Sequence, residues 1–201
     1  MFMGNSVVVH LIRHEKTRAN YERKYIGWTD ESIVMENNQF TIPLQPQIVY
    51  GSDLKRCMET AKLYFPQASY QSYEQLRELN FGDFEMKTYD QLKNNPIYRK
   101  WIDFPQQITI PNGESFQDFS DRVLDCFKVI VTKPSTYTFV VHGGVIKVLL
   151  ATFGSKNQAF RETVANHRMI YTLKWSEVSN LKGGLPCELL SVAPIMVKEN
   201  L

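Results

Sequence analysis

The sequence predicts an α/β protein, built as a three-layer α/β/α sandwich around a central, mostly parallel sheet. Two apolar runs, residues 7–13 and residues 137–142, contain no glycine or proline and have the length of strands. Runs that are apolar almost throughout are typical of strands covered on both faces, as in a parallel sheet. Helical patterns alternate with the strands along the chain, which favours a layered architecture. We find no internal repeat or linker, so residues 1–201 are expected to form a single domain.

The composition is that of an ordinary globular protein, with 43% hydrophobic and 22% charged residues and a net charge of +2. A charge this small gives no electrostatic reason to expect a nucleic acid as partner. No apolar run approaches the roughly 18 residues of a membrane span, and the first residues lack the features of a signal peptide. Cys57, Cys126 and Cys187 have neither disulfide nor metal-ligand spacing. We therefore expect a cytoplasmic protein with no metal, no cofactor and no membrane partner, while a homodimer stays open.

Periodicity and turn residues predict the remaining elements. We expect a strand over residues 47–51, followed by a helix that Ser52 or Asp53 caps. Ser115 is expected to cap a second helix, whose apolar stripe runs through residues 116–130. Two prolines within residues 31–46 disfavour a long helix there and predict a loop or a shortened helix. Further expected elements are a strand at 69–73, two helical stretches over 88–104 broken at Pro96, helices at 145–153 and 161–166, and final strands at 168–175 and 187–192 joined by a turn at 182–184.

Chemically distinctive residues occur where the two apolar strands end. Arg13 and His14 close the first strand, and His142 followed by Gly143 closes the other. In open α/β sheets, ligands bind at the carboxyl ends of the strands. Arginine offers a planar fork of donors that suits phosphate, histidine can act as a nucleophile, and a helix that begins after glycine presents free amides to an anion. The pattern favours a phosphate site, although Arg13 and His14 alone fit a strand that ends in solvated polar residues equally well.

Two other stretches carry candidate groups. Arg56 is predicted in the first turn of a helix, where a cation opposes the helix dipole and a bound anion would explain it. An irregular segment at residues 76–85 is rich in aromatic and acidic residues. Its carboxylates Glu78, Asp83 and Glu85 are equivalent candidates when judged from the residues alone.

These motifs, in this order, resemble the histidine phosphatase (phosphoglycerate mutase-like) superfamily. Arg13-His14 with Thr17 is similar to the family's Arg-His-Gly-x-Thr loop, and residues 52–61 are similar to its Ser-x-Leu-x-Arg-x-x-x-Thr-Ala element. Residues 76–85 resemble its Leu-x-Glu-x-x-Phe-Gly-x-Trp-Glu loop, and residues 142–144 match its His-Gly-Gly element. The similarity spans about two thirds of the chain and is greatest to the α-ribazole phosphatase and broad-specificity phosphatase branch.

The resemblance implies a phosphomonoesterase that hydrolyses small phosphate esters through a phosphohistidine intermediate. It implies His14 as the nucleophile, Glu78 as the proton donor, and Arg13, Arg56 and His142 as groups that clamp the phosphate. The substrate-binding residues that it implies are Thr17, Asn20, Ile26, Gly27 and Gly143. Two other functions stay open: a phosphoglycerate mutase, and an inactive phosphate-binding or interaction module on the same fold.

The chain departs from the family pattern at position 15, where Glu15 stands in place of the usual glycine. A carboxylate beside the nucleophile has the wrong sign for a phosphate pocket, so we expect Lys16 to offset it or its side chain to point away. The shortened segment before residue 47 is the other departure. Residues 88–110 are expected to lie beside the site as a small lid. His10 and His167 match no motif and are expected to be structural.

Overall fold

The computed structural model describes residues 5–36, 39–154 and 159–198. The expectation that the first residues are no signal peptide concerns mostly residues 1–4, which lie outside the described residues. The strands are β1 (Val7–Arg13), β2 (Gln39–Thr41), β3 (Ile48–Gly51), β4 (Ser69–Ser72), β5 (Thr136–Val141), β6 (Met169–Trp175), β7 (Leu189–Pro194) and β8 (Met196–Lys198). The helices are α1 (Arg18–Tyr21), α2 (Lys55–Tyr64), α3 (Tyr89–Leu92), α4 (Pro96–Asp103), α5 (Phe116–Ile130), α6 (Gly143–Phe153) and α7 (Val178–Lys182). Short 3₁₀ turns are η1 (Glu74–Leu76) and η2 (Gly82–Phe84).

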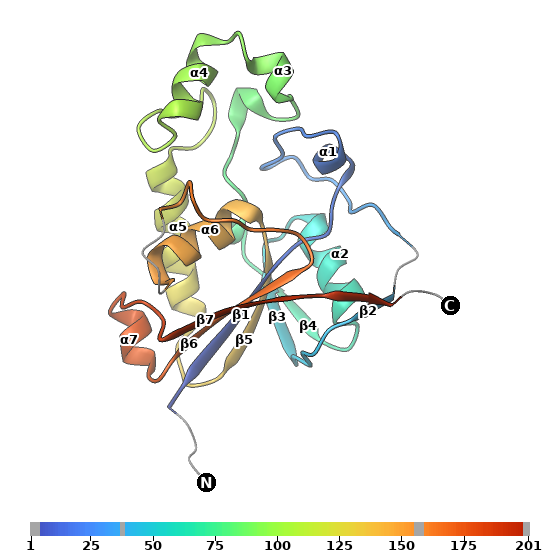
Figure 1. Ribbon diagram of the computed structural model, residues 1–201, viewed down its shortest axis with the longest axis vertical. Helices are drawn as coiled ribbons and strands as arrows, with labels where there is room; N and C mark the ends of the chain where they lie inside the picture. The colour runs from blue at the N-terminus through green and yellow to red at the C-terminus, as the bar shows by residue number, and fades with distance from the viewer. Residues whose placement is uncertain (1–4, 37–38, 155–158, 199–201) are drawn as a thin grey trace.

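Six strands form the central sheet, in the order β4-β3-β5-β1-β6-β7 (Figure 1). The pairs from β4 to β1 are parallel, whereas β6 pairs antiparallel with β1 and with β7. The predicted α/β/α sandwich with a mostly parallel sheet is confirmed. None of the helices in the described part of the chain is long and apolar enough to cross a membrane.

The side chains of β1 alternate between two buried cores, one on each face of the sheet. Val7, Val9 and Leu11 pack in the core that contains α5 and α6, whereas Ile12 packs in the core that contains α2. All four are fully buried. Burial of one such side chain contributes about 1.5–3 kcal/mol, so the strand that ends in Arg13 is firmly anchored.

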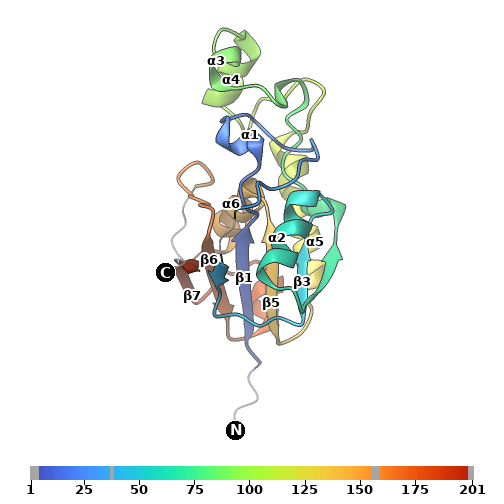
Figure 2. The same ribbon diagram turned by 90° about the vertical axis from the view of Figure 1, so that its right-hand side faces the viewer.

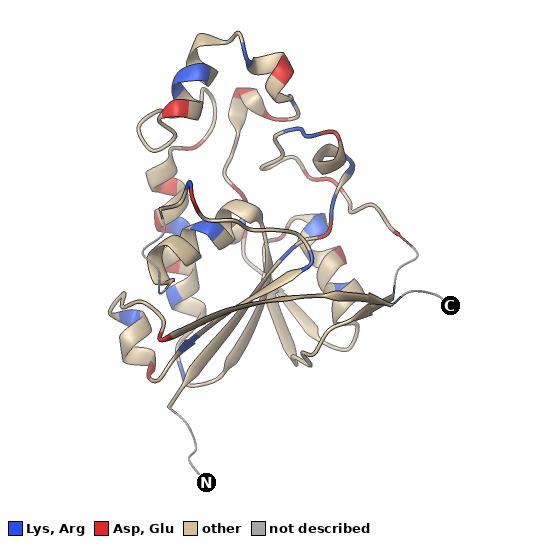
Figure 3. Cartoon of the chain, viewed as in Figure 1, with Lys and Arg blue, Asp and Glu red and all other residues tan. Residues whose placement is uncertain are grey.

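The elements α1, α3 and α4 lie beyond the carboxyl ends of the parallel strands, at one end of the molecule (Figures 1 and 2). The strands themselves carry few charged residues, and most charges lie on the helices and on the connecting segments (Figure 3). The predicted break at Pro96 is confirmed, because Asn95 caps α4 and Pro96 is its first residue. This position suits proline, which lacks the amide hydrogen that would go unpaired there.

The predicted cap of α2 is wrong. The helix begins at Lys55 after Leu54, and neither Ser52 nor Asp53 caps it. Both side chains bond to residues distant in the sequence instead: the Ser52 hydroxyl lies 2.7 Å from Nε2 of His142, and the Asp53 carboxylate pairs with Arg77. The free Lys55 amide donates instead to Asp30, at 2.8 Å.

Two expectations near the C-terminus also fail. Residues 161–166 are not helical: a turn ends at residue 162 and residues 163–166 have no regular secondary structure. The amide of Asn166 donates to the Tyr171 hydroxyl at 2.7 Å and not to a helical carbonyl. Strands β6 and β7 pair as predicted, but the short helix α7 lies within their connection, so it is no tight hairpin. Residues 31–36 and 39–46, the described part of the segment 31–46, contain no helix, as expected. Strand β2 lies in this segment and pairs with β8, which forms a small second sheet that was not predicted.

Candidate active site

His14 directly follows β1 and is buried, with only 3% of its surface exposed. Its Nδ1 lies 2.7 Å from the carbonyl oxygen of Glu15. A carbonyl oxygen can only accept a hydrogen bond, so Nδ1 carries the proton and the lone pair is on Nε2. The bond fixes the tautomer and leaves Nε2 as the nucleophilic nitrogen.

Burial lowers the pKa of His14 well below its usual value, and the neighbouring cations Arg56 and Arg13 lower it further. The pKa of His142 is lowered for the same reasons. The two rings lie 5.2 Å apart, edge to face. A neutral imidazole keeps the lone pair that nucleophilic attack requires, so His14 is ready to react at neutral pH.

Arg13 lies between His14 and the start of α6. Its Nη1 donates to the Ala165 carbonyl at 2.9 Å, whereas its buried Nε has no hydrogen-bond partner. A side-chain atom at position 143 would come within 3.1 Å of the guanidinium, and glycine there leaves the room that Arg13 occupies. A buried donor without a partner is rare in native proteins, and an anion bound at this point would satisfy it.

Arg56 is completely buried and its fork is held by the protein. Its Nη2 and Nη1 donate to the carbonyls of Gly27 and Thr29, at 2.5 and 2.8 Å, and its Nε donates to Nδ1 of His142 at 3.2 Å. These carbonyls, and not an anion alone, explain a cation in the first turn of α2. The guanidinium still lowers the pKa of His14, so its charge is directed at the site.

His142 is held on both ring nitrogens. Since Arg56 can only donate, Nδ1 of His142 accepts, and the proton on Nε2 is donated to the Ser52 hydroxyl at 2.7 Å. A direct bond from His142 to phosphate therefore requires one of these two partners to be exchanged.

Glu78 faces the first turn of α6. One carboxylate oxygen accepts from the Gly144 amide at 2.8 Å and the other from the Leu79 amide at 2.9 Å. An anion is favoured at a helix N-terminus, where amides are free and the dipole is positive. The charge of Glu78 acts on both Arg13 and Arg56, which places this carboxylate beside the cations of the site.

The other predicted binding residues are used within the fold. Thr17 and Asn20 form a capping box at the start of α1, with the Thr17 amide donating to Asn20 at 3.1 Å. Ile26 is buried. Gly27 gives its carbonyl to Arg56 and its amide to Glu85. Of the predicted set, the structure brings together Arg13, His14, Arg56, Glu78, His142 and Gly143.

Comparison with known proteins agrees with this geometry. The sequence profile of the histidine phosphatase superfamily (branch 1) matches residues 9–180. The chain belongs to the histidine phosphatase superfamily. The adenosylcobalamin/α-ribazole phosphatase of Escherichia coli K12 is 32% identical over 155 residues, covering 70% of this chain and 76% of that protein. A probable phosphoglycerate mutase, GpmB, of Salmonella paratyphi B is 28% identical over 157 residues, covering 72% and 73%.

Solved structures show the same fold. An Escherichia coli K-12 structure, provisionally named an α-ribazole-5'-P phosphatase, has a TM-score of 0.76 at 22% identity and covers 94% of this chain and 95% of its own. The α-ribazole phosphatase of Shigella flexneri has a TM-score of 0.68 at 24% identity and covers 83% and 89%.

The carboxylate that replaces the family's glycine points away from the phosphate-binding groups. Glu15 is buried and accepts from Arg168, with distances of 3.0–3.2 Å to Nε and 3.0 Å to Nη2. The Tyr64 hydroxyl donates to the same carboxylate. Its charge is therefore balanced by Arg168, and the expected offset by Lys16 is not needed.

Two positioning residues were missed from the sequence. Glu85 accepts from the amides of Gly27, Trp28 and Thr29 at 2.9–3.3 Å, which orients the carbonyls that hold Arg56. Arg122 lies at the edge of the core stripe of α5, one position before the buried Val123. It pairs with Glu114 and donates to the Glu78 carbonyl at 2.9 Å; a cation so close to an apolar stripe was the available sign of a partly buried ion pair.

His10 and His167, expected to be structural, both make internal contacts. Nδ1 of His10 lies 2.8 Å from the Thr172 hydroxyl. Nδ1 of His167 donates to the His14 carbonyl at 2.7 Å, and the two rings pack edge to face at 5.6 Å. His167 thus supports the nucleophile loop.

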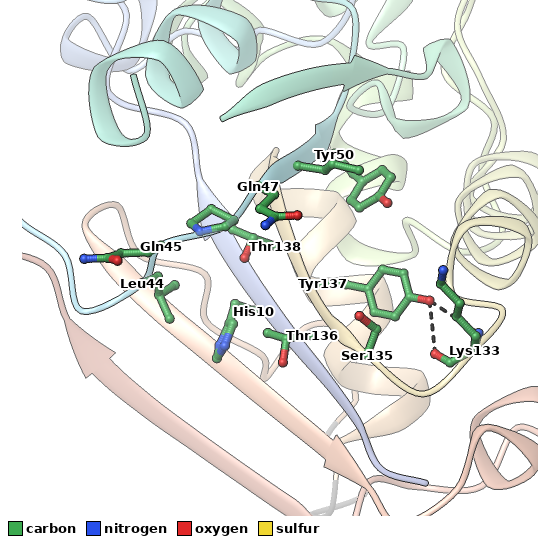
Figure 4. Close-up of a pocket in the computed structure, with 12 residues that line it drawn as sticks. His10, Leu44, Gln45, Gln47, Tyr50, Lys133, Ser135, Thr136, Tyr137 and Thr138 are labelled. Atoms are coloured by element: carbon green, nitrogen blue, oxygen red, sulfur yellow. Dashed lines mark hydrogen bonds between the residues drawn. The ribbon is translucent and has the colours of Figure 1, made fainter. Parts of the chain in front are cut away.

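Two cavities flank the sheet at opposite ends. One of about 580 Å³ lies by the amino ends of β3 and β5, where His10, Gln47 and Thr138 line it (Figure 4). The other, of about 280 Å³, is lined by Arg13, Glu78 and Gly143. Although it is smaller, the second cavity is the one that Arg13 and the candidate proton donor Glu78 line. Within the described residues, no group of three or more His, Cys, Asp or Glu side chains could hold a metal ion.

Proposed function

We propose that this protein is a phosphomonoesterase that hydrolyses small phosphate esters through a phosphohistidine on His14. The observation that carries the proposal is the pairing of a neutral, oriented imidazole with two arginines, the buried Arg56 and the partly buried Arg13, whose Nε is an unused donor. A phosphate ester brings negative charge that must be neutralised before a nucleophile can approach. The cations of this site supply that neutralisation in a buried setting, where it is worth most.

The first step forms the phosphoenzyme. Arg13, Arg56 and the Gly143 amide bind the non-bridging oxygens, and Nε2 of His14 attacks phosphorus in line. The bond from phosphorus to the leaving oxygen breaks, and protonated Glu78 gives that oxygen its proton. General acid catalysis of this kind contributes roughly 10²–10⁴-fold.

The second step returns the enzyme to its starting state. Water attacks the phosphohistidine, the Glu78 carboxylate takes the proton from that water, and the bond from phosphorus to nitrogen breaks. Inorganic phosphate leaves, with His14 neutral and Glu78 protonated again. Dividing one displacement into two easier ones is the purpose of a covalent intermediate.

A phosphoglycerate mutase is the alternative, and one group of relatives carries that name. A mutase must hold a second anionic group of its substrate while the intermediate turns over in the site. The cavity beside Glu78 offers only Arg13 and Lys147 as cations among its described lining residues. Incubation with 3-phosphoglycerate and 2,3-bisphosphoglycerate separates the two, because a mutase forms 2-phosphoglycerate while a phosphatase releases phosphate.

The direct test is replacement of the nucleophile. His14→Ala should abolish hydrolysis of p-nitrophenyl phosphate and the acid-labile phosphoenzyme seen after rapid quenching. His10→Ala is the matched control, because His10 lies at the other cavity and bonds only Thr172 among the contacts described. Labelling that persists in His14→Ala and maps to another residue would contradict the assignment.

Two further properties belong to the same proposal. Residues 88–110 act as a lid over the site, supported by Trp101 of α4, which lines the cavity beside Glu78. The protein functions in the reducing cytoplasm, supported by Cys57 and Cys126, which are buried free thiols.

A further inference from the structure

The cavity beside Glu78 has strongly aromatic walls. It has a volume of about 280 Å³, and its described lining includes Tyr25, Phe81, Trp101, Phe116, Phe119 and Phe160. Arg13 and Glu78 also line it. Under the proposed function Glu78 protonates the leaving oxygen, so the group attached to that oxygen must enter this cavity.

The aromatic residues form two walls from distant parts of the chain. On one wall, the ring of Tyr25 lies 5.2 Å from Phe81 and 5.7 Å from Trp101. On the other, Phe116 lies 4.8 Å from Phe160. Four of these rings, all except Trp101, are only partly buried although they pack against the main core. They therefore have faces or edges left to contact a ligand, in the arrangements that aromatic pairs prefer.

One cation also faces this cavity. Lys147 lies on α6, one turn after Gly143, and its Nζ is 5.4 Å from the centre of the Phe160 ring. It forms no ion pair within 4.0 Å among the described residues. Burial lowers the pKa of Lys147, which is the expected effect of removing an ammonium from water without a partner. A ligand that supplies an acceptor or an anion would compensate this cost.

The cavity is poorly suited to a polyhydroxylated leaving group. The Tyr25 hydroxyl is already bonded to the Tyr98 hydroxyl at 2.7 Å. A sugar or glycerol would therefore exchange water for aromatic carbon and leave hydroxyls unpaired, at a cost of about 1–3 kcal/mol each. A flat ring has no such cost.

We propose that this cavity selects phosphate esters whose leaving group carries a flat aromatic ring, with an anionic or acceptor substituent that reaches Lys147. The inference rests on the proposed function, because it places the phosphate at Arg13 and the leaving group between the two aromatic walls. The ring packs against the partly buried Phe81 and Phe160, and Lys147 bonds its substituent.

The test compares esters whose leaving alkoxides are alike, so that chemical reactivity is constant. The probes are 2-phenylethyl phosphate, 2-cyclohexylethyl phosphate, glycerol 1-phosphate and the 4-carboxy derivative of 2-phenylethyl phosphate. We expect kcat/KM for the phenyl ester to exceed that for the cyclohexyl ester about tenfold. The 4-carboxylate should raise kcat/KM about fivefold above that of the phenyl ester. Lys147→Met should remove this fivefold gain and leave the preference for the phenyl over the cyclohexyl ester unchanged.

Variants assign the selectivity to this cavity. Phe160→Ala should reduce the preference for the phenyl over the cyclohexyl ester to about twofold. Val129→Ala, at an exposed valine of α5, and Lys182→Met, at an exposed lysine of α7, do not line the cavity; they are the matched controls and should keep both preferences.

Binding separates this inference from the proposed function. Titration calorimetry of the four esters with His14→Ala measures affinity without turnover, and the same order of affinities is expected. If wild type hydrolyses none of the esters but His14→Ala keeps this order, the phosphatase proposal fails while the aromatic selectivity stands. Equal affinities for the phenyl and cyclohexyl esters, with hydrolysis intact, would overturn the aromatic selectivity alone.

Discussion

Replacement of Arg122 by lysine should slow catalysis by displacing Glu78, whose backbone carbonyl, and not its carboxylate, accepts a hydrogen bond from Arg122. The Arg122 guanidinium donates to the carbonyls of Gln75 and Arg77 at 2.7 and 2.8 Å, and to the Glu78 carbonyl at 2.9 Å. Its two remaining donors bind the Glu114 carboxylate at 2.5 and 2.8 Å. Lysine keeps the charge against Glu114, but a single ammonium cannot reach all three carbonyls.

The structure sets the size of the effect. Three hydrogen bonds from a charged guanidinium, at about 1.5–3 kcal/mol each, set an upper limit of about 9 kcal/mol on the loss of unfolding free energy. In catalysis, a misplacement of about 1 Å costs on the order of 100-fold, and the ceiling is the roughly 10²–10⁴-fold contribution of proton transfer itself. We therefore expect Arg122→Lys to lower kcat for an alkyl phosphate by roughly 10–100-fold. The loss for p-nitrophenyl phosphate should be a few-fold at most, since its leaving group departs without a proton.

The assay is a double-mutant cycle between positions 122 and 78, with kcat measured for both esters. Because Arg122 acts through Glu78, Arg122→Lys should have almost no effect in a Glu78→Gln background. Arg99→Lys, at an exposed arginine of α4, is the control and should leave kcat unchanged. Additive losses in the cycle, or equal losses for both esters, would show that Arg122 stabilises the fold without positioning the acid.

Three further predictions concern single groups. Glu78→Gln should lower kcat for alkyl phosphates by roughly 10²–10⁴-fold and that for p-nitrophenyl phosphate far less; equal losses would assign Glu78 to binding. Activity should survive EDTA, and restoration by a divalent cation after a loss would contradict the metal-independent mechanism. Burial lowers the pKa of His167 to about 3, so the unfolded chain binds a proton below pH 6.5 that the folded chain does not. His167 alone should thus lower the free energy of unfolding by about 1.4 kcal/mol per pH unit from pH 6.5 towards pH 3, in addition to the effect of His14 and His142. Urea unfolding of His167→Asn should show a pH dependence that is shallower by this amount.

The parts of the site that the sequence predicted are those encoded locally. An apolar run specifies a buried strand, and the residues at its end face the site wherever the sheet is parallel. This is why Arg13, His14 and His142 could be placed before any coordinates were known. The glycine after His142 could be placed in the same way, because the start of α6 requires close approach by Arg13.

The partners of these groups could not be predicted, since they come from distant segments. Arg56 is bonded by carbonyls of residues 27 and 29, and those carbonyls are oriented by Glu85. Nothing in the local sequence distinguishes Glu85 from a solvated carboxylate. Ser52 has the properties of a helix cap, but contact with His142, 90 residues away, decides its role. Local preference is a weak guide where a tertiary partner offers a better hydrogen bond.

Both departures from the family pattern, Glu15 and the shortened segment before residue 47, contact the same residue, Arg168. Arg168 pairs with Glu15, which stands where the family has glycine, and also with Glu36 at 2.7 Å, in the segment that is expected to be a helix in relatives. Its guanidinium lies 5.3 Å from the ring of Phe40 in β2. Residue 168 has a φ of 58°, a left-handed conformation that non-glycine residues adopt rarely.

This arrangement makes the two departures interdependent. A glycine at position 15 would leave Arg168 with Glu36 alone, and a helix over residues 31–46 would replace β2 and with it the contact to Phe40. Conversely, Glu15 without Arg168 would be a buried, unbalanced anion next to the nucleophile, which is costly in free energy and repels phosphate. Glu36 and Phe40 therefore support the nucleophile loop through Arg168, and the carboxylate beside His14 is a structural anchor whose charge Arg168 neutralises.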